Sequence, residues 1–271
     1  MPIFTYNGQK ISYEDYGSGP IILLIHGSPG NARSWEQVGK RLADRFRVIA
    51  PDLPGYGETS LQPVGEPPEA GYASRLIERL IGQVGVPFVL AGHSYGGVVA
   101  LNLALHGGVP LGGLVLVEPV ALKILPLVGE SEAFAKAKDV FEDYITSFEK
   151  GNHRAVQKMV DFWFGTGAFD HLPSQLTAYL VEETASNIRD VRATFNESYS
   201  SDTFQGLRIP VEVIIGDHSP DITLRIGQAI VDQLRAGRLW KLKNADHGMI
   251  TTHIDALVRI IEEITTADNS Y

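Results

Sequence analysis

One ten-residue segment near the middle of the chain, VLAGHSYGGV at residues 89–98, constrains the fold most. It holds the pattern Gly92-x-Ser94-x-Gly96 between an apolar run that ends at Ala91 and a helical pattern that begins at Ser94. A turn from strand to helix this tight has room only for glycine at positions 92 and 96, because a Cβ atom there would meet the neighbouring strand or helix. Such a turn exposes the Ser94 hydroxyl at the carboxyl edge of a sheet and at the N-terminus of a helix.

Short, continuous apolar runs recur along the chain, and this pattern is typical of strands that are buried on both faces of a parallel sheet. The runs are Ile21–Ile25, Val86–Ala91, Gly113–Val117 and Val211–Ile215, with a weaker run at Phe46–Ala50 and an expected edge strand at Arg238–Leu242. An Asn7-Gly8 turn between alternating segments predicts a hairpin over Thr5–Tyr16.

Helical patterns lie between these runs, at Ser34–Arg45, Ala73–Val84, Ser94–His106, Thr223–Leu234 and Ile254–Ile264. Strands that alternate with helices indicate a sheet covered on both faces. The sequence therefore predicts an α/β fold with a mostly parallel eight-stranded sheet flanked by helices.

Residues 119–205 interrupt the alternation with consecutive helical patterns and no strand-like run. Eight of the eleven phenylalanines of the chain fall in this segment. We expect a single domain over residues 1–271, with a helical cap insertion at 119–205 that lies over one edge of the sheet. Its aromatic side chains are expected either to pack the insertion or to line an apolar pocket, and the sequence leaves both open.

Composition excludes several classes of function. The chain has no cysteine, which removes disulfides, thiol nucleophiles and Cys-based metal sites. Lys and Arg number 23 against 32 Asp and Glu, so the net charge of −9 disfavours nucleic acid and anionic membranes as partners. The chain lacks the H-E-x-x-H, P-loop and G-x-G-x-x-G patterns, so we expect no metal and no cofactor. We expect a small-molecule substrate, and a homo-oligomer stays open.

Location is also suggested by the absence of certain segments. No apolar run reaches the roughly 18 residues that a membrane-spanning helix needs. The first residues show no basic stretch followed by an apolar one, which a secretory signal would have. A cytoplasmic location is the resulting expectation.

Four motifs, taken in their order, make the chain resemble the α/β-hydrolase superfamily. They are His26-Gly27-Ser28-Pro29-Gly30, Asp52-Leu53-Pro54-Gly55-Tyr56-Gly57, the segment Gly92–Gly96, and Asp246-His247-Gly248-Met249. The resemblance implies that Ser94 is the nucleophile and that the backbone N–H groups of Ser28 and Tyr95 bind an oxyanion. His247 is the expected general base, because imidazole titrates near neutral pH and the loop after the last strand can lie over the serine.

The acidic partner of the histidine departs from the common pattern of the superfamily. Most members carry an Asp shortly after the seventh strand, but residues 216–220 read GDHSP, so a serine stands at that position. Some members place the acid at the end of the strand that follows the nucleophile, where this chain has Glu118. Because adjacent strands lie about 4.8 Å apart, a carboxylate there can reach His247. We expect Glu118 to orient the base, with Asp217 as the first alternative and Asp221 as the second.

These residues predict a serine hydrolase that cleaves a small or medium carboxylic ester through an acyl-enzyme intermediate. Two alternatives use the same fold: a carbon–carbon bond hydrolase, and a cofactor-free haloperoxidase or perhydrolase-like enzyme. A binding protein without catalysis is a further alternative, against which the intact Ser94 and His247 argue. Dehalogenases and epoxide hydrolases of this fold need an Asp where Ser94 stands.

Overall fold

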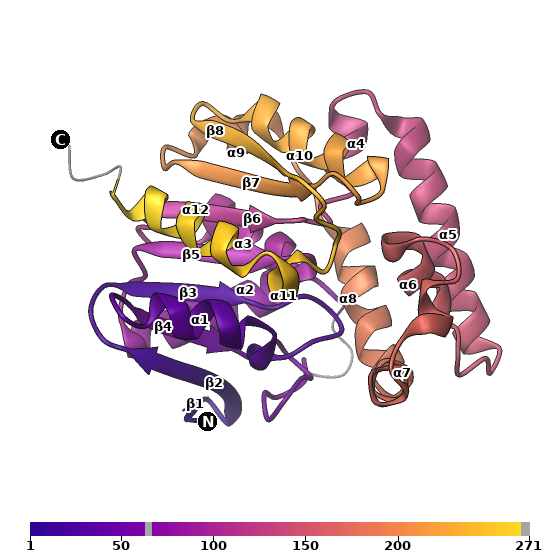
Figure 1. Ribbon diagram of the computed structural model, residues 1–271, viewed down its shortest axis with the longest axis horizontal. Helices are drawn as coiled ribbons and strands as arrows, with labels where there is room; N and C mark the ends of the chain where they lie inside the picture. Colours follow the sequence, from indigo (N-terminus) through magenta and orange to yellow (C-terminus); the bar gives the residue numbers. More distant parts are fainter. Residues whose placement is uncertain (63–66, 267–271) are drawn as a thin grey trace.

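The computed structural model describes residues 1–62 and 67–266. At its centre lies an eight-stranded sheet in the order β1-β2-β4-β3-β5-β6-β7-β8 (Figure 1). Its strands are β1 Ile3–Tyr6, β2 Gln9–Gly17, β3 Ile21–Ile25, β4 Arg47–Pro51, β5 Val89–His93, β6 Gly113–Val117, β7 Val211–Gly216 and β8 Gly237–Leu242. β2 pairs antiparallel with β1 and β4, and all other neighbours pair parallel. The predicted mostly parallel eight-stranded α/β sheet is confirmed.

Helices cover both faces of the sheet, because the central strands are apolar on both sides. In β3, Leu23 and Ile25 join the core under α2, α3 and α10, whereas Ile22 and Leu24 join the core under α1 and α12. These helices are α1 Glu36–Leu42, α2 Ala70–Val84, α3 Tyr95–His106, α10 Asp221–Gln233 and α12 Ile254–Thr266. In Figure 1, α1 and α12 lie in front of the strands.

A helical stretch follows β6 and ends before β7. It holds α4 Ile124–Leu127, α5 Ser131–Glu149, α6 Val156–Phe164, the 3₁₀ helix η2 Ala168–His171, α7 Ser174–Glu182, α8 Thr184–Asn196 and α9 Ser201–Gly206. The structure describes every residue of this stretch, and no strand occurs in it. Helices α5 to α8 lie beside the carboxyl ends of the strands, at the right of Figure 1. The helical stretch therefore lies at the edge of the sheet where Ser94 is expected.

Most predicted elements differ from the structure by one to three residues at an end, and two differences have a clear physical or structural form. The strand expected from Val86 begins at Val89, because Pro87 has no N–H for a sheet ladder and Val86 is half exposed. The helix expected at Ser34–Arg45 divides into the 3₁₀ helix η1, Ala32–Trp35, and α1. Among the described residues, no helix combines the length and apolar character that crossing a bilayer requires.

Candidate active site

The turn between β5 and α3 holds Ser94 in a backbone conformation that is sterically unfavourable for a residue with a side chain. Its φ is 53° and its ψ is −121°. A Cβ atom at Gly92 would lie 2.2 Å from the carbonyl oxygen of Gly96, and one at Gly96 would lie 2.3 Å from that of His26. Both glycines are therefore required by close backbone approach, as the sequence predicts, and the turn is fixed from both sides.

Three side chains from distant parts of the sequence meet at this turn. His247 Nε2 lies 3.0 Å from Ser94 Oγ, and His247 Nδ1 lies 3.1 Å from Glu118 Oε2. Ser94, His247 and Glu118 are 7%, 4% and 0% exposed, so the chain of contacts is shielded from water. A carboxylate at Nδ1 favours the tautomer that carries its proton there, which leaves Nε2 free to accept the serine proton.

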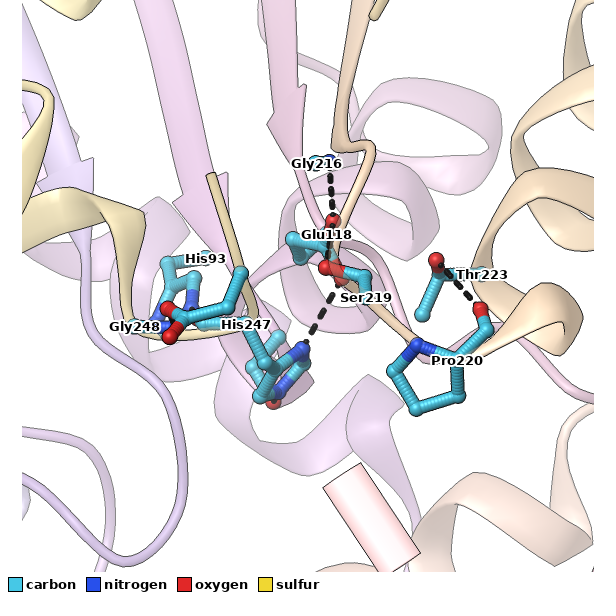
Figure 2. A network of polar contacts seen from close by, with 10 residues as sticks. His93, Glu118, Gly216, Ser219, Pro220, Thr223, His247 and Gly248 are labelled. Carbon is cyan, nitrogen blue, oxygen red and sulfur yellow. Dashed lines mark hydrogen bonds and ion pairs between the residues drawn. The ribbon is translucent and has the colours of Figure 1, made fainter. Parts of the chain in front are cut away.

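Glu118 is held at the end of β6 by groups that follow β7. Its Oε1 accepts hydrogen bonds from the Gly216 N–H at 2.6 Å and from the Ser219 hydroxyl at 2.8 Å, as Figure 2 shows. The other oxygen, Oε2, faces His247 (Figure 2). The Glu118 carboxylate is fully buried, and hydrogen-bond partners at both of its oxygens replace the water that it has lost.

The two alternative acids lie elsewhere. Asp217 Oδ1 is 3.9 Å from His218 Nε2, and Asp221 forms an ion pair of 2.6 Å with Arg225. In the parts of the chain that the structure describes, the carboxylate in contact with His247 belongs to Glu118 and to neither of them.

Ser28 and Tyr95, the expected oxyanion residues, both lie beside Ser94 in one cavity. Ser28 is in the loop after β3, and Tyr95 is the first residue of α3, where helical N–H groups have no intrahelical acceptor. Across residues 1–62 and 67–266, neither N–H donates to another backbone group. Both remain available to an acceptor in the cavity.

His26 and His93 support the backbone around the site. His26 Nε2 accepts from the Leu53 N–H at 2.9 Å, while His93 Nε2 donates to the carbonyl of His247 at 2.8 Å. Burial lowers the pKa of His26 to about 4 and that of His93 to about 3, so both rings are neutral at pH 7. Both rings therefore hold backbone segments around the site through their hydrogen bonds.

Aromatic side chains from the helical stretch form much of the cavity wall. Phe141 of α5, Trp163 of α6 and Phe195 of α8 line it together with Ser94. The Trp163 ring stacks on His247. Other aromatic residues of the stretch, such as the fully buried Phe204, pack against the core. Both alternatives for these side chains are thus realised, each by different residues.

Three polar residues near Ser28 were not singled out from the sequence as functional. Asn187 Nδ2 donates to Ser28 Oγ at 2.9 Å, Ser28 Oγ lies 2.8 Å from the Tyr56 hydroxyl, and that hydroxyl donates to Asp190 Oδ2 at 2.7 Å. Asn187 and Asp190 stand three residues apart on α8, and this spacing puts them on one helical face. The sequence did offer one sign of this polar group: an amide and a carboxylate at helical spacing within a segment rich in aromatic residues.

A carboxylate in this position carries an energetic cost. Burial raises the pKa of Asp190 to about 6, even though hydrogen bonds from Ser28 and Tyr56 act to lower it. Among the described residues, no group of His, Asp and Glu side chains is arranged to hold a metal ion.

Comparisons with known proteins agree with this architecture. A sequence model of the Alpha/beta hydrolase family matches residues 22–260. Two solved structures resemble the chain in fold. A thermophilic esterase from Thermogutta terrifontis is 22% identical, with a TM-score of 0.70, over 96% of this chain and 95% of its own. An esterase from Exiguobacterium antarcticum is 18% identical, with a TM-score of 0.74, over 97% of this chain and 98% of its own.

Curated relatives match over shorter stretches. An uncharacterised protein of Mycobacterium tuberculosis is 41% identical over 101 residues, which is 37% of this chain and 29% of that protein. A pimeloyl-[acyl-carrier protein] methyl ester esterase of Pseudoalteromonas atlantica is 33% identical over 123 residues, 45% of this chain and 42% of that protein. A fluoroacetate dehalogenase of a Burkholderia species is 40% identical over 94 residues, 33% of this chain and 31% of that protein. The matched stretches span less than half the length of these relatives. The family model, in contrast, spans most of this chain, so the chain belongs to the alpha/beta hydrolase family.

Proposed function

We propose that the protein is a serine hydrolase that cleaves a small or medium carboxylic ester through an acyl-Ser94 intermediate. The observation that carries this proposal is the hydrogen-bonded chain from Ser94 Oγ to His247 to Glu118 at a strand-to-helix turn. A serine hydroxyl is a weak nucleophile until a base accepts its proton, and this geometry supplies that base. Esterases among the relatives and fold neighbours are in line with it.

The first half of the reaction forms the acyl-enzyme. His247 Nε2 takes the proton of Ser94 as Oγ attacks the carbonyl carbon of the ester. The N–H groups of Ser28 and Tyr95 donate to the oxygen that becomes negative, which is worth about 3–4 kcal/mol for each donor. Glu118 stabilises the imidazolium, and His247 then gives its proton to the leaving alcohol as the carbon–oxygen bond breaks.

The second half hydrolyses the acyl-enzyme. Water loses a proton to His247 and attacks the acyl carbon, and the same two N–H groups bind the second oxyanion. Return of that proton to Ser94 Oγ releases the carboxylic acid and restores the starting state.

The helical stretch at 119–205 is proposed to be a cap that supplies the apolar wall of the substrate site. Phe141, Trp163 and Phe195 contribute this wall. Turnover of p-nitrophenyl esters against acyl chain length tests it: apolar acyl groups should be preferred, and a preference for charged esters would contradict the proposed wall.

The proposed nucleophile is tested with a fluorophosphonate and mass spectrometry of the labelled peptide. The adduct is expected on Ser94, and Ser94→Ala should lose both the adduct and ester turnover. An adduct on another residue, or ester turnover that survives Ser94→Ala, would refute the proposal. Assay of a vinylogous diketone beside the esters separates carbon–carbon bond hydrolysis, and peroxide-dependent halogenation without ester turnover would favour the remaining alternative.

A further inference from the structure

We propose that Asp190 is a specificity-determining residue, which binds a hydroxyl or amide N–H carried by the substrate close to its scissile carbonyl. This inference rests on the proposed function and adds the substrate class: esters with a hydrogen-bond donor near the carbonyl that Ser94 attacks.

The position of Asp190 is the first observation. The residue comes from α8 and lines the same cavity as Ser94 and Ser28. Asp190 is 6% exposed, and much of the wall of the same cavity is apolar, with Phe141 and Phe195 among its residues. A ligand whose carbonyl reaches Ser94 therefore lies within the cavity that contains this carboxylate.

The partners of Asp190 are the second observation. Its Oδ2 accepts a hydrogen bond from the Tyr56 hydroxyl at 2.7 Å. Among the residues that the structure describes, no cation forms an ion pair with Asp190, and the neighbouring Arg189 donates instead to the Pro54 carbonyl at 3.3 Å. The Ser28 hydroxyl also acts on this carboxylate as a hydrogen-bond donor. A carboxylate offers about four acceptor positions, so the Ser28 and Tyr56 hydroxyls use only part of its capacity.

The direction of the hydrogen bonds is the third observation. The Tyr144 hydroxyl donates to Asn187 Oδ1 at 2.9 Å, and the chain continues through Ser28 and Tyr56. Each member can donate to the next, and Asp190 is the acceptor at the end. An amide oxygen would accept the Tyr56 proton equally well without the cost of burying a charge. A hydrogen-bond donor on the substrate, which would use the remaining acceptor capacity, explains why position 190 holds a carboxylate rather than an amide.

The test compares pairs of p-nitrophenyl esters that differ only in the donor. The pairs are lactate with isobutyrate, β-hydroxybutyrate with isovalerate, and N-acetylglycinate with laevulinate, in which a methyl or methylene group replaces the O–H or N–H. For each pair the readout is the ratio of kcat/KM between the donor ester and its isostere. In the wild-type protein we expect the donor ester to be favoured by about tenfold or more in at least one pair, because a charged acceptor strengthens the hydrogen bond.

Asp190→Ala should reduce that ratio more than fivefold in the same pair. Asp190→Asn serves if the alanine variant does not fold: its oxygen can still accept from Tyr56, while an NH₂ group replaces the second acceptor, so the ratio should again fall more than fivefold. A fall of less than fivefold in every pair overturns the proposal.

Tyr56→Phe is the matched control for a merely supporting role. It removes the hydroxyl between Ser28 and Asp190 but leaves the carboxylate in the cavity. We expect this variant to lower kcat on both members of a pair alike and to keep the ratio. If Asp190→Ala also lowers both members alike, Asp190 only supports the loop and the proposal is wrong. Failure of the proposed function is distinct, since it would abolish the Ser94 adduct and ester turnover in the wild-type protein itself.

Discussion

Trp163 lies parallel to the imidazole ring of His247, with ring centroids 4.8 Å apart and 13° between the ring planes. Trp163 belongs to α6, whereas His247 follows β8 at the far end of the chain. The proposed cap thus touches the proposed base directly and covers it with an aromatic face, in the position where a cation on the imidazole would be stabilised.

Replacement of this ring should slow catalysis. We expect Trp163→Leu to lower kcat by about two- to thirtyfold, since an aromatic face stabilises a cation by about 0.5–2 kcal/mol. Trp163→Phe should retain most of the activity. The measurement is kcat on p-nitrophenyl butyrate at a temperature where thermal unfolding shows each variant to be folded.

Phe164 provides the control for this prediction. It is adjacent in α6, its ring lies at 79° to the His247 ring with centroids 5.7 Å apart, and it is 46% exposed. Phe164→Leu should change kcat by less than about threefold, because the Phe164 ring is nearly perpendicular to the imidazole, farther from it than Trp163, and partly exposed to water. Full activity in folded Trp163→Leu would contradict the role of stacking.

The acid is tested by two substitutions that remove charge and keep shape. Glu118→Gln should lower kcat by about three to four orders of magnitude, because an amide NH₂ facing His247 Nδ1 favours the wrong tautomer. Asp217→Asn should change kcat by less than about threefold, since Asp217 lies beside His218 and not beside His247. Stopped assays at high enzyme concentration measure the residual rate, and an active Glu118→Gln would refute the assignment.

Much of the sheet and of the turn that holds Ser94 can be predicted from local sequence. The run Gly113–Val117 coincides with β6, and the requirement for glycine at 92 and 96 follows from the sharpness of one turn. The strand is visible within its own segment. The glycine pattern marks the turn, although the atom that excludes a Cβ at Gly96 is the His26 carbonyl oxygen, which is remote in sequence.

Other features depend on packing between elements that are remote in sequence. The sequence favours Glu118, but it does not indicate that the Ser219 hydroxyl, at the usual place of the acid, donates to Glu118 Oε1. Likewise, Asn187 and Asp190 meet the Ser28 loop only because one face of α8 packs there. Helical periodicity shows which residues share a face but not which loop that face meets.

Stability should fall in mild acid because of the two buried histidines. Burial lowers the pKa of His26 from 6.5 to about 4 and that of His93 to about 3, so the unfolded chain binds more protons below pH 6.5. Each should reduce the free energy of unfolding by up to about 1.4 kcal/mol per pH unit as the pH falls from 6.5 toward 4. Asp190 acts in the opposite direction, because its pKa is raised to about 6 and the folded chain binds that proton first. Burial also raises the pKa of Glu197 and that of Glu212, which opposes the histidines in the same way. The loss that the histidines cause is therefore measured as the difference between the wild-type protein and a variant in which one of the two rings is replaced.

Urea unfolding at pH 7.5 and pH 5 measures this loss. In His26→Gln the side-chain oxygen can still accept from the Leu53 N–H but does not titrate, so the difference between the two pH values should shrink. A difference between the two pH values that is unchanged in folded His26→Gln would show that this histidine does not contribute to acid sensitivity.

Two glycines with open surroundings separate backbone conformation from packing. A Cβ atom at Gly82 or Gly165 would meet no atom within 4 Å, but Gly82 is helical, in the last turn of α2, whereas Gly165 has a φ of +99°. We expect Gly82→Ala to stabilise the protein by about 0.5–1 kcal/mol, because alanine loses less backbone freedom on folding. Gly165→Ala should destabilise it by about 1–2 kcal/mol, because a side chain is strained at positive φ. Urea unfolding measures both changes in stability, with an unchanged m value expected.

The activity of the stabilised variant is the control. Neither glycine lines the proposed substrate cavity, so ester turnover by folded Gly82→Ala should equal that of the wild-type protein. A destabilised Gly82→Ala would contradict the interpretation that glycine at this position costs stability through its backbone entropy.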